Sequence, residues 1–283
     1  MPVRLERSGY GKSGIRIVKV ARDGDRHDIK DLTVAIQFGG EFLRVHTEGD
    51  NSTVLPTDTM KNTVYAIARR YSWDQAEEFA VILADHFFAD NPHVGTIRID
   101  IEEHRWDRLT IGGKPHRTAF SRAGREIRTA HVFRSADGQR TVEGGVADLV
   151  IIKTAQSGFE GYMRDRYTTL RETRDRLFAT SMTARWRYSG KGLDYGVSWE
   201  AVRKLLLEAF AEHDSRSVQH TLYAMAESVI ENVADVDEIT LTLPNRHHLL
   251  VDLKPFGLEN DNEIFVVTEE PFGLIEATVR RAE

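Results

Sequence analysis

The chain has 283 residues, a formal net charge of -6 and no cysteine. Its length predicts one large or two medium domains, and its 41% hydrophobic and 29% charged residues are typical of folded soluble proteins. The acidic balance argues against nucleic acid as the main partner, because proteins that bind it carry a basic domain or stripe. The absence of cysteine excludes disulfides, thiolate nucleophiles and cysteine-ligated zinc.

The sequence also carries no sign of a membrane or export signal. No apolar run approaches the ~20 residues that a membrane-spanning helix needs. The first residues lack the apolar core of a secretory signal, and the last residues do not form a Ser-Lys-Leu peroxisomal address. We therefore expect a cytoplasmic chain without a membrane partner.

The first half of the chain is predicted to contain strands, then two helices, then strands. The helices start at Thr57 and Ser72, where Ser72 and Gln75 form a capping-box pattern and Asn91 precedes the proline that ends the second helix. Alternation of apolar and polar residues predicts strands over 14–22, 27–38, 41–48, 96–106, 126–134 and 146–154.

The second half repeats this order of elements without repeating the sequence. A strand pattern over 182–188 precedes helices over 198–210 and from Ser217. Strand patterns follow over 238–244, 247–254, 263–269 and 274–281. Strand-rich ends around paired helices predict an α+β fold in which helices cover one face of an antiparallel sheet. Such a sheet leaves open edges, so we expect an oligomer.

Polar residues at two helix starts have either a structural role or a ligand-binding role. Thr57 or Asp58 as an N-cap explains the first start, and the alternative is that its free N–H groups and dipole hold an anion. At the second start Ser217 is a good cap, Val218 begins the apolar stripe, and Gln219 lies in the first turn. Gln219 is either an exposed helix residue or a carboxamide that reads a ligand edge.

Two further clusters are also ambiguous from spacing alone. Pro244-Asn245 predicts a bend between strands, after which His247 and His248 point to opposite faces and cannot share one metal ion. Arg176 lies in a mixed-charge run, where an arginine is commonly a surface ion-pair partner but also offers a planar fork to a planar anion. A third stretch, residues 103–116, either binds a ligand or stabilises an interface.

Taken together, six motifs resemble one family. They are YGK, TDTMKNTVY, HRWDRLTIGGKPH, FEGYMRDRYTTLRETRDR, SVQHTLYAMAE and LPNRHH, in the order and at the approximate separations seen in urate oxidase (uricase). The likeness runs from about Tyr10 to Val279. It implies two tandem tunnelling-fold (T-fold) domains, 1–145 and 146–283, with antiparallel sheets backed by paired helices. It also implies barrels formed by subunit pairing, a homotetramer, and active sites between subunits.

The resemblance implies a substrate-binding role for several matching residues. Arg176 and Gln219 would hold the pyrimidine side of urate, together with the backbone N–H of Val218. Phe159 would stack beneath the purine, and the backbone N–H of Asp58 would meet its imidazole side.

The resemblance further implies a proton relay of Lys12, Thr57 and His247, with Lys12 and Thr57 supplied by the adjacent subunit. Asn245 would hold dioxygen, and later water, above the ring. Urate is an electron-rich anion that can reduce dioxygen once a second proton is removed, so no metal and no organic cofactor is expected. The expected products are 5-hydroxyisourate and hydrogen peroxide.

Two other functions are consistent with the sequence. One is a zinc-dependent pterin or purine hydrolase of the same fold, against which the missing cysteines and the histidine spacing count. The other is an inactive oligomeric purine-binding protein, against which the joint presence of the relay residues counts. One departure from the family pattern lies after His116, where residues 117–120 read Arg-Thr-Ala-Phe in place of a second histidine and Ser-Phe.

Overall fold

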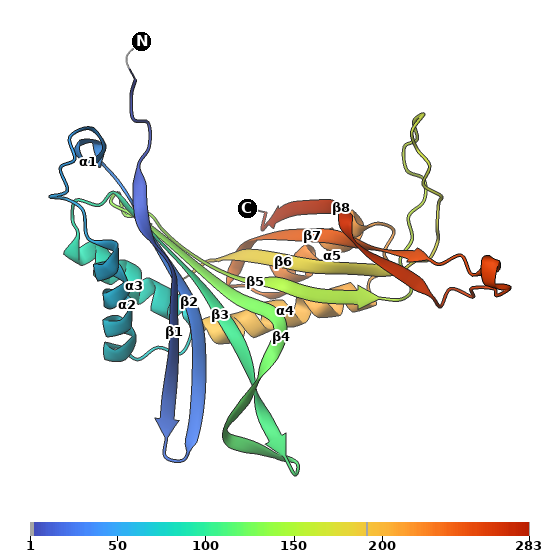
Figure 1. Ribbon diagram of the computed structural model, residues 1–283, viewed down its shortest axis with the longest axis horizontal. Helices are drawn as coiled ribbons and strands as arrows, with labels where there is room; N and C mark the ends of the chain where they lie inside the picture. The colour runs from blue at the N-terminus through green and yellow to red at the C-terminus, as the bar shows by residue number, and fades with distance from the viewer. Residues whose placement is uncertain (1–2, 191, 283) are drawn as a thin grey trace. The chain divides into compact units, whose positions relative to one another are not determined.

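The computed structural model describes residues 3–190 and 192–282. The chain divides into two compact units, Met1–Gly145 and Val146–Glu283. Figure 1 shows strands and helices in both units, and β5 (Arg140–Lys153) contains the boundary between them.

The first unit is an antiparallel sheet with its helices on one face. Its strands follow chain order as β1 (Gly9–Asp23), β2 (Arg26–Gly39), β3 (Thr96–Ile111) and β4 (Lys114–Ser135). Its helices are α1 (Leu43–Thr47), α2 (Thr57–Arg70) and α3 (Ala76–Asp90). The helix α2 packs on β1, while α3 packs on β3 and β4 (Figure 1).

Alternation along the strands explains this arrangement. In β2 every second side chain is buried, and in β3 the same is true of the row that faces the helices. Each such side chain contributes about 1.5–3 kcal/mol when it leaves water. The buried row consists of Leu32, Val34, Ile36, Phe38, Ile97, Ile99 and Ile101, and its helical partners include Met60, Val64, Ile67, Phe79, Leu83 and Phe87.

The second unit has the same kind of organisation. It contains β6 (Phe178–Tyr188), α4 (Tyr195–Glu212), α5 (Val218–Asn232), β7 (Val236–Leu250), the short 3-10 turn η1 (Lys254–Phe256) and β8 (Phe265–Arg280). The helix α5 packs on β7, on β8 and on α4 (Figure 1). The buried sheet residues include Met182, Ala184, Trp186, Ile239, Leu241 and Leu243.

The predicted order of strands and helices is confirmed, but several local predictions are wrong. Residues 41–48 form no strand: Leu43–Thr47 is the helix α1, which directly follows Phe42, buried against Tyr10 at 5.0 Å between ring centroids. The capping box of α3 is made by Gln75 and Glu78 rather than by Ser72 and Gln75.

The two strands predicted on either side of Pro244-Asn245 are one strand, β7. The two predicted over 263–281 are likewise one strand, β8. The bend between strands is replaced by an irregularity in pairing between Asn245 and His247, where the extra residues lie on β8. A local bulge lets both strands continue without a break.

Candidate active site

Lys12 and the start of α2 lie close together in the first unit. The hydroxyl of Tyr10 accepts a hydrogen bond from the Leu55 N–H at 2.9 Å, which ties β1 to the segment just before α2. Because side chains two residues apart on a strand share a face, Lys12 lies on the same side as Tyr10. The Lys61 hydrogen bond is the main cause that lowers the pKa of Asp58, and the Lys12 charge adds to it. The ammonium of Lys12 is therefore near the first turn of α2.

The predicted N-cap of this helix is wrong. Pro56 occupies the cap position, and no side chain caps the helix. Thr57 and Asp58 are its first two helical residues, and the Asp58 carboxylate accepts hydrogen bonds from Lys61 and Asn62. Proline suits this place because its fixed φ leads the chain into the helix. With no side-chain cap, the N–H groups of the first turn stay open, as an anion site requires.

Phe159 and Arg176 meet in the second unit. Phe159 exchanges backbone hydrogen bonds with Thr173 at 2.7 and 3.2 Å, which brings the two segments side by side. The guanidinium carbon of Arg176 then lies 5.3 Å from the centroid of the Phe159 ring. Tyr162 stacks on the same ring at 4.8 Å and 13°. Gly158 permits this approach, because a Cβ there would lie 3.0 Å from the Arg174 carbonyl oxygen.

The electrostatics of Arg176 distinguish it from its neighbours in the arginine-rich run. Arg164 pairs with Glu172 at 3.7 Å, and Arg174 pairs with Glu160 at 3.3 Å. Arg176 has no carboxylate partner within the part of the chain that the structure describes, and burial lowers the pKa of its guanidinium. The surface ion-pair alternative for Arg176 therefore finds no support among the described side chains. A half-buried cation without a counter-ion is suited to an anionic ligand.

The start of α5 is built as the sequence predicts. Ser217 is the N-cap, and its hydroxyl accepts the His220 N–H at 3.1 Å. Val218 is buried and Gln219 is exposed. The helix α5 has 15 residues and is about 22 Å long, a length that about seven strand residues also span. The chain turns at Val236 after α5 and returns along the helix as β7. The start of α5 therefore lies near the part of β7 that contains Asn245.

Asn245 and His247 lie on β7 at the pairing irregularity. Asn245 faces Thr180 on β6 and Gly273 on β8, and His247 faces Thr268. The neighbouring His248 ring bonds locally to the Arg246 carbonyl oxygen at 3.2 Å. The structure thus separates the two histidines, as the strand geometry predicts.

The predicted polar residues share one property. None of their side chains makes a hydrogen bond or salt bridge with any group that the structure describes, and the six in question are Lys12, Thr57, Arg176, Gln219, Asn245 and His247. Five of the six side chains are half-buried, where polar groups commonly find a partner, and Gln219 is exposed. Their free donors and acceptors are therefore available to a ligand. The structure places the first two in one unit and the other four in the other.

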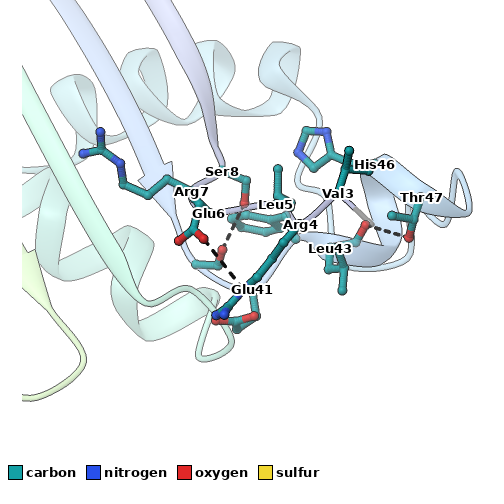
Figure 2. Close-up of a pocket in the computed structure, with 12 residues that line it drawn as sticks. Val3, Arg4, Leu5, Glu6, Arg7, Ser8, Glu41, Leu43, His46 and Thr47 are labelled. Atoms are coloured by element: carbon teal, nitrogen blue, oxygen red, sulfur yellow. Dashed lines mark hydrogen bonds and ion pairs between the residues drawn. The ribbon is translucent and has the colours of Figure 1, made fainter. Parts of the chain in front are cut away.

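The cleft at the N-terminal segment and His116 do not belong to this set of six residues. The cleft of about 750 Å³ in Figure 2 is lined by the N-terminal segment and α1, and contains none of these residues. His116 accepts the N–H groups of Thr118 and Ala119 through its Nδ1, so it stabilises its own strand. Tyr10 and Tyr162 were not predicted as site residues, although both are aromatic residues within the six family motifs.

Comparison with known proteins gives the family. The family model described as Uricase matches residues 8–133 and 142–276. The chain belongs to the uricase family. It is 45% identical over 279 residues to the uricase of Arthrobacter globiformis, covering 99% of this chain and 90% of that protein. It is 40% identical to the uricase of Dictyostelium discoideum, covering 96% of each.

The solved uricase structures agree with this assignment. The crystal structure of uricase from Arthrobacter globiformis has a TM-score of 0.94, with 99% of this chain and 96% of that one covered. The fold is the α+β T-fold that the sequence predicts. Within the described residues, no group of three or more histidines, aspartates or glutamates is arranged to hold a metal ion. None of the helices there is long and apolar enough to cross a membrane.

Proposed function

We propose that this uricase family member oxidises urate with dioxygen and water to 5-hydroxyisourate and hydrogen peroxide, using no metal or organic cofactor. The observation that carries the proposal is the set of partner-free polar side chains on β1, at the two helix starts, in the loop before β6 and on β7. They supply a cation, a carboxamide pair, a base, a hydroxyl and an imidazole, which is what the reaction needs.

We assign urate binding to residues of the second unit. The guanidinium of Arg176 and the carboxamide of Gln219 hydrogen-bond the pyrimidine edge of the purine, and the Val218 N–H at the start of α5 adds a donor. The purine stacks on Phe159, whose other neighbour, Tyr162, keeps its ring in place. Fixing the ring while negative charge grows on it is electrostatic preorganisation.

We assign proton transfer to Lys12, Thr57 and His247. The Thr57 hydroxyl takes the second proton of urate and passes it to the Lys12 amine, while the Asp58 N–H steadies the imidazole edge of the anion. The dianion gives two electrons to dioxygen held by Asn245. The resulting peroxide leaves as hydrogen peroxide, taking back one proton from the relay and one from a ring N–H. Water then adds as hydroxide to the carbon that the peroxide leaves, and its proton passes through His247 to the ring nitrogen.

We further propose that the site forms between subunits of a homotetramer. The domains 1–145 and 146–283 pair with those of a second chain into barrels, so that Lys12 and Thr57 of one chain meet Arg176 and Gln219 of its partner. A C2 arrangement then gives two equivalent shared sites.

Mixing two inactive variants tests this sharing. Lys12→Met chains keep a native urate pocket, and Arg176→Gln chains keep a native relay. If sites are shared, co-expression restores about a quarter of native activity, because half of the sites in mixed pairs hold both native residues. If each site lies within one chain, every site carries one substitution and no activity returns.

The relay assignment has its own test. Thr57→Ala is expected to lower kcat by about 10²–10⁴-fold with little change in the KM for urate, because the hydroxyl acts in proton transfer. Equal losses in both constants would show that Thr57 only binds substrate. Thr63→Ala is a matched control, since Thr63 lies on the same helix and its hydroxyl bonds only the Thr59 carbonyl oxygen at 2.9 Å.

A further inference from the structure

A short extended segment, residues 157–159, joins the stretches that carry the proposed urate-binding residues. On one side Ser157 forms a parallel bridge with Ser215, which lies just before the start of α5. On the other side Phe159 forms an antiparallel bridge with Thr173, which belongs to the stretch before β6. The relative positions of the ring, the guanidinium and the carboxamide that would hold urate therefore depend on this segment.

One backbone N–H of the segment is bound by a side chain. The Ser157 N–H donates to Oδ1 of Asp175 at 3.2 Å. Ser157 is only 1% exposed, so its N–H has little access to water and depends on this acceptor. Asp175 directly precedes Arg176 in the sequence. The carboxylate thus ties the stretch that carries Arg176 to the segment that carries Phe159.

The position of the Arg176 side chain depends on such ties. Its guanidinium carbon lies 5.3 Å from the centroid of the Phe159 ring, and no carboxylate among the described residues holds it. A long side chain without an ion-pair partner takes its place from its own backbone and from what it packs against. Asp175 is exposed and forms no salt bridge within the described chain, so its bond to Ser157 is the contact that a substitution removes.

We propose that Asp175 is a positioning residue for urate binding, whose carboxylate keeps the Phe159 segment and the Arg176 stretch in register so that ring and guanidinium reach the same ligand. The inference rests on the proposed function. Asp175 does not itself bind urate, because a carboxylate repels an anion. A positioning role and a charge role for Asp175 therefore predict opposite effects of its removal.

Asp175→Ala removes the acceptor and the charge together. If Asp175 positions the segment, the KM for urate should rise about tenfold, while kcat at saturating urate changes less than about twofold. If Asp175 acts only through its charge, the KM should fall, because a negative charge near an anionic ligand is lost. Asp175→Asn keeps an acceptor oxygen for the Ser157 N–H and should restore a KM close to that of the unmodified protein.

Glu160→Ala is the matched control, because it removes a carboxylate from the same loop. The Glu160 carboxylate lies 3.3 Å from Nε of Arg174 in an exposed ion pair. Exposed pairs contribute little, so this variant should keep the KM and kcat of the unmodified protein.

Amide hydrogen exchange adds a readout that needs no urate. In Asp175→Ala the N–H groups of residues 157–159 should exchange faster, and in Asp175→Asn they should exchange as in the unmodified protein. An unchanged or lower KM in Asp175→Ala, an equal rise in KM in Asp175→Asn, or unchanged exchange in Asp175→Ala would each overturn the proposal. Failure of the unmodified protein to turn over urate would instead refute the proposed function, so the two failures are distinct.

Discussion

Tyr10→Phe tests how the first unit positions Lys12 and Thr57, which belong to the proposed relay. The change deletes the hydroxyl that accepts the Leu55 N–H at 2.9 Å. It leaves the ring in contact with Phe38 and Phe42, at centroid distances of 5.8 and 5.0 Å. Burial raises the pKa of Tyr10, so the hydroxyl stays protonated at neutral pH. Only the link between β1 and the start of α2 is lost.

The expected stability loss is modest and the expected activity loss is specific. One net hydrogen bond contributes about 0.5–1.5 kcal/mol, and that range corresponds to a fall of a few degrees in Tm for a unit of this size. Because Lys12 lies two residues beyond Tyr10 and Thr57 two beyond Leu55, loosening the link misaligns the relay. We expect kcat to fall about tenfold, with the KM for urate unchanged.

Urate oxidation followed by absorbance, together with thermal unfolding, measures both effects. Tyr71→Phe is the matched control, since Tyr71 is exposed and its ring hydroxyl has no hydrogen-bond partner in the described chain. A Tyr10→Phe enzyme that loses stability but keeps native kcat would contradict a role of this link in activity. In that case the link would stabilise the fold without aligning Lys12 and Thr57.

Two further predictions concern the second unit. Gly158→Ala places a Cβ 3.0 Å from the Arg174 carbonyl oxygen, so the Phe159 segment must shift and the KM for urate should rise about tenfold in steady-state assays. Burial lowers the pKa of His213 below 6.5, and the charges of His220 and Lys153 lower it further. The contribution of neutral His213 to the free energy of unfolding should therefore be fully present above about pH 6.5. It should be lost as the pH falls through the lowered pKa. His213→Gln should flatten that slope in urea unfolding at about pH 5 and about pH 7.5, and an unchanged slope would show that His213 is not the group responsible.

Local patterns predicted most elements of this fold. The alternation in 27–38 and the cap at Ser217 were sufficient, because each depends on residues within a few positions. The strand predicted over 41–48 failed because Phe42 is held by a distant residue, Tyr10. The continuity of β7 through Pro244-Asn245 depends on pairing with β8, which sequence spacing does not reveal.

The site residues, too, could be predicted only as far as neighbouring residues in the sequence determine them. Spacing placed Arg176 in a charged run but could not distinguish it from Arg174, since only the folded loop brings Glu160 to one and not to the other. The six motifs together indicated the family, which the comparisons show.

Dioxygen uptake by chelator-treated protein supplied with urate tests whether this protein oxidises urate without a cofactor. We expect each urate consumed to take up one dioxygen and to release one hydrogen peroxide, with no dependence on added metal. Urate binding without dioxygen uptake would contradict this expectation and indicate an inactive purine-binding protein. Turnover that needs zinc and consumes no dioxygen would also contradict it and indicate a hydrolase.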